Sequence, residues 1–170
     1  MKMFNVNKLS ALSAAVLMVG SFGVQAATKV IQVRASVDTS LSVEDISGTW
    51  DAPIFMQANS DNTGLETVTM TLNFTANDYK DVSVTLQSAP SLVDTQQNLS
   101  IPLEFKLGGE TLAQNSAVTA LKTNLFEYDA TNTQMTGPKN VPLTIESANS
   151  GSLQSGNYTG SFVLNFELQP

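Results

Sequence analysis

Residues 156–168 read GNYTGSFVLNFEL, and every second position from Gly156 onward is either apolar or glycine. The alternating set is Tyr158, Gly160, Phe162, Leu164, Phe166 and Leu168. Successive side chains of a β-strand point to opposite faces, so a period of two places this whole set on one face. The stretch therefore predicts a strand with one buried face, two residues before the chain ends.

The same alternation recurs along the rest of the chain and predicts an all-β fold. Residues 29–41 carry the set Ile31, Val33, Ala35 and Val37 on one face. The later sets are Val68, Met70, Leu72 and Phe74; Val82, Val84 and Leu86; Ile101, Leu103, Phe105 and Leu107; and Val141, Leu143 and Ile145. Residues 65–75 and 79–87 are separated by an Asn77-Asp78 turn signal, so we expect a hairpin or adjacent strands there.

Turn residues mark where these strands end. Gly108-Gly109 suits the positive φ angles of a tight hairpin, with residues 110–113 as the returning strand. Pro102 cannot donate a main-chain hydrogen bond and indicates a sheet edge or the start of a strand. Residues 117–127 fit a strand, a helical turn or an ordered loop.

Residues 51–64 are rich in Asp, Asn, Ser and Gly, and this composition predicts a loop. The apolar residues that could attach it to the core are Trp50, Ile54, Phe55 and Met56. Short strands separated by turns, with no helices between them, favour a two-sheet antiparallel sandwich of the immunoglobulin type.

The first 26 residues have the layout of a secretory signal peptide. Lys2 and Lys8 precede an apolar run from Leu9 to Val19, which is too short to span a bilayer. Small residues at its end predict cleavage before Ala27, with Thr28 as the second choice. Without the two lysines, six basic and fifteen acidic side chains remain, a net charge of −9. Nucleic acid and anionic membranes are therefore poor partners.

The residue types that most enzymes require are missing. The chain has no histidine and no cysteine, so the common general base, the thiol nucleophile, the usual zinc sites and disulfides are all excluded. The remaining carboxylate groupings are Glu44 with Asp45, Asp78 with Asp81, and Asp51 with Asp61. None has the spacing of a calcium loop or a glycosidase pair, so we interpret them as solvated surface charges and expect no enzymatic activity, metal or cofactor.

The two ends of the secreted chain are its most distinctive parts. Val33-Arg34-Ala35-Ser36-Val37-Asp38 near the start and Gly156-Asn157-Tyr158-Thr159-Gly160 near the end resemble the major pilins of the alternate chaperone-usher pathway, the class 5 or colonisation-factor fimbriae. One departure is Thr39, where the family usually has proline directly after the Ser-Val-Asp of this segment.

The resemblance implies an immunoglobulin-like sandwich that lacks its last strand and is completed by donor-strand exchange. In this reading residues 27–40 form a donor strand and residues 41–170 the pilin domain. Ile31, Val33, Ala35 and Val37 would fill the groove of the next copy, and Tyr158, Phe162, Leu164 and Phe166 would border that groove. From periodicity alone, the better interpretation of residues 31–37 is the first strand of a complete sandwich, and the resemblance to pilins together with the missing disulfide favours the donor strand instead.

The partners implied are further copies of the chain in a homopolymer, a periplasmic chaperone, an outer-membrane usher, a tip adhesin and a host-cell glycan. The expected location is a fimbrium on the cell surface, reached through the periplasm. Two alternatives stay open: a minor or tip-associated fimbrial subunit, and a secreted monomeric carbohydrate-binding sandwich. In the second, Trp50, Phe55, Tyr79 and Tyr128 would be the stacking platforms, although core anchoring for the first two and edge positions for the tyrosines is the simpler interpretation.

Overall fold

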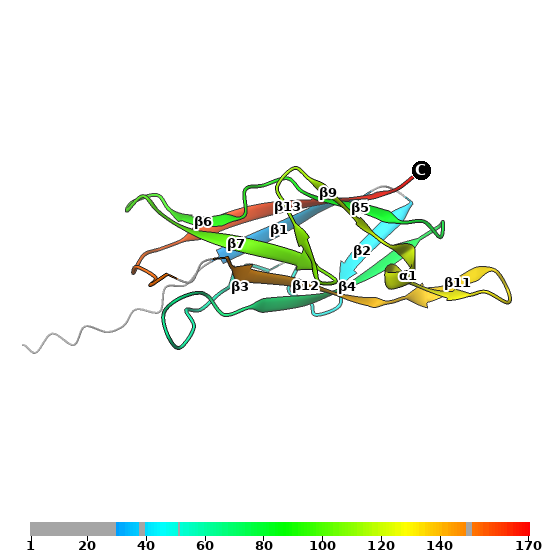
Figure 1. The fold of residues 1–170 in the computed structure, drawn as a ribbon, viewed down its shortest axis with the longest axis horizontal. Helices are drawn as coiled ribbons and strands as arrows, with labels where there is room; N and C mark the ends of the chain where they lie inside the picture. The colour runs from blue at the N-terminus through cyan, green and yellow to red at the C-terminus, as the bar shows by residue number, and fades with distance from the viewer. Residues whose placement is uncertain (1–29, 38–39, 51, 149–150) are drawn as a thin grey trace, which may run out of the picture.

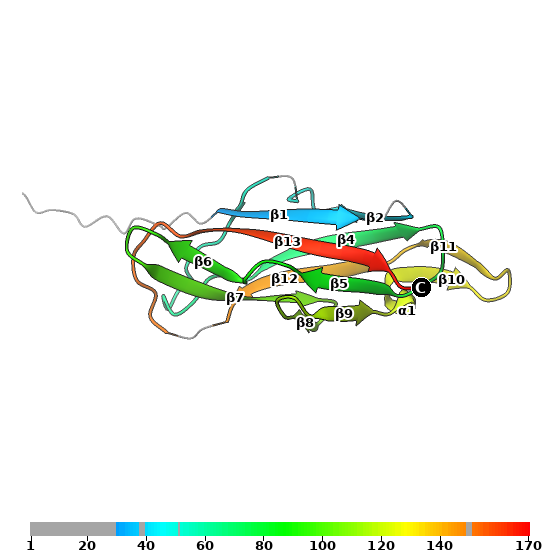
Figure 2. The same ribbon diagram turned by 90° about the horizontal axis from the view of Figure 1, so that it is seen from above.

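A computed structural model describes residues 30–37, 40–50, 52–148 and 151–170. They form an elongated two-layer β-sandwich (Figures 1 and 2). The first seven strands are β1 (Val30–Val37), β2 (Leu41–Asp45), β3 (Ile54–Phe55), β4 (Val68–Ala76), β5 (Val82–Leu86), β6 (Ser91–Asp94) and β7 (Leu99–Leu107). The later elements are β8 (Glu110–Leu112), β9 (Ala117–Ala120), α1 (Lys122–Leu125), β10 (Phe126–Asp129), β11 (Gln134–Pro138), β12 (Asn140–Ser147) and β13 (Thr159–Leu168). The predicted signal peptide lies outside the described residues.

One layer is built around β13. Its neighbours are β1 on one side and β5 on the other, and β9 and β3 extend the layer outward at the two edges. β6 pairs with the first residue of β13. Every pairing of β13 is antiparallel except the one with β1, which is parallel.

The other layer has the order β2, β4, β12, β7 and β8, all antiparallel. β7 belongs to both layers. Its first half pairs with β6 and its second half with β12 and β8. The change of partner falls at Pro102 and Leu103, so Pro102 lies inside the strand where it crosses between layers. Pro102 has a ladder partner on one side only, Ser91 of β6, which agrees with the predicted edge position and with the missing N–H. The alternative prediction of a strand start was wrong, because β7 begins at Leu99.

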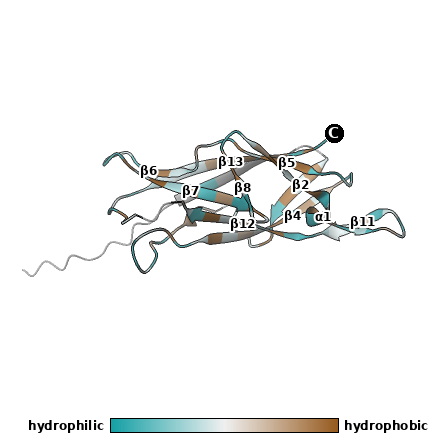
Figure 3. Cartoon of the chain, viewed as in Figure 1, coloured by the Kyte–Doolittle hydropathy of each residue, from teal (hydrophilic) through white to brown (hydrophobic). Residues whose placement is uncertain are grey.

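The core lies between the layers and is formed by the alternating apolar positions that the sequence marked (Figure 3). The buried residues of β4, β5 and β12 are Met70, Leu72 and Phe74; Val82, Val84 and Leu86; and Val141, Leu143 and Ile145. Gly108 and Gly109 have φ angles of 59° and 93° in the turn between β7 and β8, which confirms the predicted hairpin.

Two expectations need correction, and one question that the sequence left open is answered. β4 and β5 do not pair, because the turn at Asn77 carries the chain from one layer to the other. The expected loop at residues 51–64 contains β3, which pairs with β1. Ile54 and Met56 are buried in it as predicted, whereas Phe55 is 54% exposed and does not anchor the loop to the core. Residues 117–127 contain a strand, a helical turn and the start of another strand in succession.

Candidate functional site: the edge shared by the first and last strands

The core face of β13 is fully apolar and contacts the opposite layer. Phe162, Leu164 and Phe166 have no exposed surface, and Tyr158, directly before the strand, is 2% exposed. The Phe162 ring centroid lies 4.9 Å from that of Phe105 on β7, and the Phe166 centroid lies 5.7 Å from that of Phe74 on β4. All four residues predicted to border the groove are therefore buried, three of them on β13 and Tyr158 directly before it.

β1 occupies the edge of β13 in the same chain. Its eight residues pair in parallel with Thr159 to Phe166, and the main-chain register aligns Val33 with Phe162, Ala35 with Leu164 and Val37 with Phe166. Ile31 is aligned with Gly160, and Gln32 is exposed. The two segments at the ends of the sequence, which were predicted to meet between copies, lie side by side within one chain (Figure 2).

The other edge of β1 is paired over only two residues. Val30 and Ile31 pair with Phe55 and Ile54 of β3, and the pairing ends there. β1 is therefore held mainly by one ladder, to β13. Only residues 38 and 39 separate its last residue, Val37, from Ser40, whose carbonyl accepts a hydrogen bond from the Asn77 amide at 3.1 Å.

A buried carboxylate organises the start of β13. Asp94, 3% exposed at the end of β6, accepts hydrogen bonds from the main-chain amides of Gln96 at 2.9 Å, Gln97 at 3.1 Å and Asn157 at 2.7 Å. The Gln97 amide lowers the pKa of Asp94 most; burial opposes this, and the amides of Asn157 and Gln96 lower it further. Asp94 therefore connects the turn after β6 to the segment that leads into β13.

Sequence reasoning missed Asp94, because no strand was predicted for the short stretch at residues 91–94. A local signal was present: Asp followed by Thr-Gln-Gln-Asn is typical of a turn in which an aspartate side chain accepts amide hydrogen bonds two and three residues on. Next to it, the Tyr158 hydroxyl donates to the Gln154 carbonyl at 2.9 Å. Burial, followed by the charge of Asp94, raises the pKa of Tyr158.

Two carboxylates of the other groupings, Asp45 and Asp81, have structural contacts. Asp45 accepts hydrogen bonds from the main-chain amides of Ser47 at 2.9 Å, Thr49 at 2.7 Å and Trp50 at 2.9 Å, which orders the turn after β2. Burial raises the pKa of Asp45, but hydrogen bonds from Ser47 and Thr49 outweigh it and the net shift is downward. Asp81 accepts from the Lys122 amide at 2.8 Å. The interpretation of these two as purely solvated charges was therefore wrong, and Asp51 lies outside the described residues.

The aromatic residues considered as sugar platforms are spread over the molecule. Trp50 is half-buried with its ring centroid 6.4 Å from that of Phe166, so it anchors to the core. The Tyr79 and Tyr128 rings stack on each other at 4.2 Å between centroids, and the Lys122 ammonium lies 5.1 Å from the Tyr79 centroid. One ring face of each tyrosine is therefore covered by a contact within the chain and is not open for stacking on a sugar.

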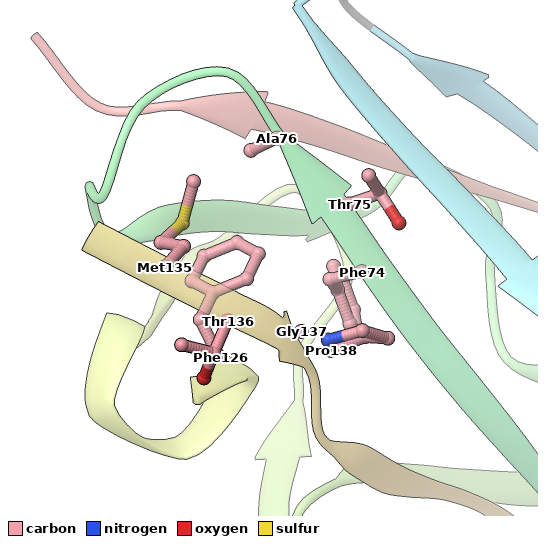
Figure 4. Close-up of a pocket in the computed structure, with 8 residues that line it drawn as sticks. All are labelled: Phe74, Thr75, Ala76, Phe126, Met135, Thr136, Gly137 and Pro138. Carbon is pink, nitrogen blue, oxygen red and sulfur yellow. The ribbon is translucent and has the colours of Figure 1, made fainter. Parts of the chain in front are cut away.

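Within the described residues, no cluster of three or more potential metal-ligating side chains occurs. In the same residues no helix has the length and apolar character needed to cross a membrane. An apolar cleft of about 280 Å³ opens between the end of β4 and the β10–β11 hairpin (Figure 4).

Comparison with known proteins agrees with this architecture. Among solved structures, the chain is similar to the CooA pilin subunit from enterotoxigenic Escherichia coli, with a TM-score of 0.55 and 16% identity, over 77% of this chain and 99% of that one. No curated protein matches the chain by sequence. Residues 27–167 match the family of CS1 type fimbrial major subunits. The chain therefore belongs to the CS1 type fimbrial major subunits, structural proteins that polymerise with copies of themselves into an extracellular fimbrium.

Proposed function

We propose that the subunit polymerises by donor-strand exchange, in which β1 leaves its own chain and enters the groove beside β13 of the next copy. Ile31, Val33, Ala35 and Val37 are then the donor residues. Tyr158, Phe162, Leu164 and Phe166 border the acceptor groove. The observation that carries the proposal is the β1–β13 ladder: the N-terminal strand pairs along the last strand and is held on its other side by only two residues of β3.

The energy of this exchange is large relative to the stability of one domain. An extended segment on an open edge gains a row of main-chain hydrogen bonds while alternate side chains enter pockets. Burying three branched aliphatic side chains and an alanine contributes about 5–10 kcal/mol before ordering costs. Domain stabilities have the same magnitude, so a subunit with an empty groove is marginal, and its own β1 or a chaperone strand must protect it.

The direction of the donated strand follows from the topology. Within one chain β1 runs parallel to β13, so the connection from β1 to β2 lies at the end of the molecule where β13 finishes. This end is here called the linker end. The opposite end, where β13 begins, is called the start end. Parallel insertion into a neighbour would bring two linker ends together and allow two copies to close into a dimer. An open fibre needs unlike ends to meet, so the donated strand runs antiparallel to the acceptor β13.

The other roles follow from this assembly route. The chain is exported by its signal peptide, received in the periplasm by a chaperone that covers the groove, passed to an outer-membrane usher, and added to a fibre that carries a tip adhesin for a host-cell glycan. The subunit itself acts as a structural element without catalysis. Its single acidic domain fits the shaft of the fibre.

The test uses a chain that starts at residue 38 and a synthetic peptide of residues 27–37. We expect the shortened chain to unfold at low temperature and the peptide to raise its melting temperature, because a ligand that binds only the folded state stabilises it by mass action. A peptide with Val33→Asp should fail, since a carboxylate would have to enter an apolar groove. A Gln32→Asp peptide is the matched control and should bind, because Gln32 is exposed.

Two results would contradict donor-strand exchange. One is a shortened chain that is as stable as the full chain and indifferent to the peptide. The other is equal stabilisation by the Val33→Asp and Gln32→Asp peptides, which would mean that the alternating face of β1 is not what the groove recognises.

A further inference from the structure

The cleft at the linker end is apolar and open to solvent. It lies between the last residues of β4 and the β10–β11 hairpin, and no charged side chain lines it (Figure 4). Phe74 and Phe126 are buried in its walls, while Met135 and Ala76 are half-buried. Its volume of about 280 Å³ is enough for a large apolar side chain. Covering apolar walls of this kind with a second apolar surface is favourable, because it removes apolar area from water.

The cleft lies directly beside the place where the donor strand leaves the molecule. Leu41, the first residue of β2, pairs with Ala76, which lines the cleft. Ser40 precedes it, and only residues 38 and 39 connect Ser40 to the end of β1. Three Cα–Cα steps of 3.8 Å span at most about 11 Å. The copy that receives β1 must therefore come within about 11 Å of Ser40, and its body meets this end of the molecule.

The start end presents the complementary surface. Val93 on β6 is 37% exposed and belongs to the residue pair Val93–Thr159, at the first position of β13. Phe55 on β3 is 54% exposed and pairs with Val30, which pairs on its other side with Thr159. In antiparallel insertion the donated Val37 lies near Thr159. The two exposed apolar side chains then flank the point where the donated strand enters.

We infer that the cleft at the linker end of one copy binds the start end of the neighbouring copy. Phe55 and Val93 of the copy that receives β1 then lie against Met135 and Ala76 of the copy that donates it. This inference rests on the proposed donor-strand exchange and adds a second, side-chain contact to it. The partner is a second copy of this chain, because donation of β1 through a two-residue linker holds the body of that copy within about 11 Å of Ser40. The contact sets the angle between successive subunits, whereas the donated strand sets their order.

Cysteine cross-linking tests the contact cleanly, because the natural chain contains no cysteine. Fibres are assembled from subunits carrying both Met135→Cys and Val93→Cys, or Met135→Cys and Phe55→Cys, and are exposed to a mild oxidant. We expect a ladder of covalent multimers on non-reducing gels from at least one pair. The matched control is Thr69→Cys with Val93→Cys. Thr69 is an exposed residue of the same strand but lies five positions before Phe74, where the cleft begins, so this pair should give no ladder.

Fibres that assemble but give no ladder from either pair would overturn the inference. So would covalent dimers from Met135→Cys alone, because these would mean that two linker ends meet. Neither result affects donor-strand exchange itself, which the peptide experiment tests separately.

A second variant fills the cleft without a cross-link. Gly137 lines the cleft together with Met135, and a Cβ atom added there would meet nothing within 4 Å. Gly137→Leu should leave the melting temperature of the subunit and its peptide uptake unchanged, while its fibres fragment severalfold faster in denaturant than those of a Thr69→Leu control. Fibres as durable as the control would also overturn the inference.

Discussion

At the scale of single residues, the Gly156-Asn157-Tyr158-Thr159-Gly160 segment is explained by close packing at the start of β13. A Cβ atom on Gly156 would lie 2.7 Å from Oδ2 of Asp94 and 2.8 Å from the Tyr158 ring. A Cβ atom on Gly160 would lie 2.8 Å from Cδ2 of Leu92 and 3.1 Å from the Ser91 carbonyl oxygen. Both glycines are therefore required because β6 approaches the chain closely at this point.

This packing predicts the effect of adding one methyl group. Gly156→Ala and Gly160→Ala should each lower the free energy of unfolding by about 1–3 kcal/mol, the usual cost of overpacking a filled site. Gly151→Ala is the control, because a Cβ there meets nothing within 4 Å; it should be neutral or slightly stabilising. Chemical denaturation of the three variants measures the difference, and equal stabilities would contradict the packing argument.

The pKa shifts of Asp94 and Asp45 predict how the subunit responds to acid. Both pKa values lie below the ordinary 3.8 in the folded state, so the stability they contribute is complete above that value and is lost as pH falls through the folded pKa values. We expect the melting temperature to fall steeply below about pH 4. Asp94→Asn should unfold more easily at pH 7, because the asparagine side chain cannot accept all the main-chain amide hydrogen bonds that the carboxylate accepts. It should lose less stability on acidification, because the asparagine amide is not protonated in this range.

The exposed loop residue Asp61 supplies the comparison for this experiment. Asp61→Asn should follow the wild-type curve of melting temperature against pH, since in the described part of the chain the exposed Asp61 side chain accepts a hydrogen bond from the neighbouring Ser60 hydroxyl alone. An acid response in Asp94→Asn as steep as in the wild type would show that Asp94 does not contribute to the loss.

At the scale of elements, the sequence predicts strands well where one face is continuously buried. β4, β7, β12 and β13 have eight to ten residues each, so the period of two is repeated often enough to be recognised. β6 has four residues, and the alternating positions on its buried face are Leu92 and the polar Asp94, so no apolar period marks it. The β10–β11 hairpin was missed because its positions are mostly exposed and a bulge between Glu127 and Tyr128 interrupts its period.

Which strands pair is not contained in the apolar pattern. The alternation in β4 and β5 predicts two strands correctly, but the same pattern fits a hairpin and a crossover between layers equally. The same limit applies to the candidate site. Periodicity identifies Val33 and Phe162 as positions on buried faces, whereas their alignment across 129 residues of chain depends on the long-range ladder between β1 and β13. Only the resemblance to pilins brought these two segments together before the structure did.

At the scale of the whole molecule, β1 pairs with β13 of its own chain, and under the proposed exchange this same segment has to enter the next copy. Eight main-chain pairs to β13 and two to β3 hold β1 in place, so under this proposal a free subunit is protected but also self-inhibited. A lone subunit and a fibre subunit would differ in the direction of the strand beside β13, parallel in the first and antiparallel in the second. Conversion between them cannot occur by sliding, because a strand must leave the edge before another can pair in the opposite direction.

This self-inhibition predicts the kinetics of exchange. A secreted-length chain of residues 27–170, mixed with excess labelled peptide of residues 27–37, should take up the peptide at a rate that reaches a plateau as the peptide concentration rises, because release of β1 limits the process. Even about 3 kcal/mol of net stabilisation of the closed form would slow uptake roughly a hundredfold. The chain starting at residue 38 has no β1 to release, so its uptake rate should rise in proportion to peptide concentration. A proportional rise for the full chain as well would show that the incoming strand displaces β1 directly, and the closed form would then be no barrier to assembly.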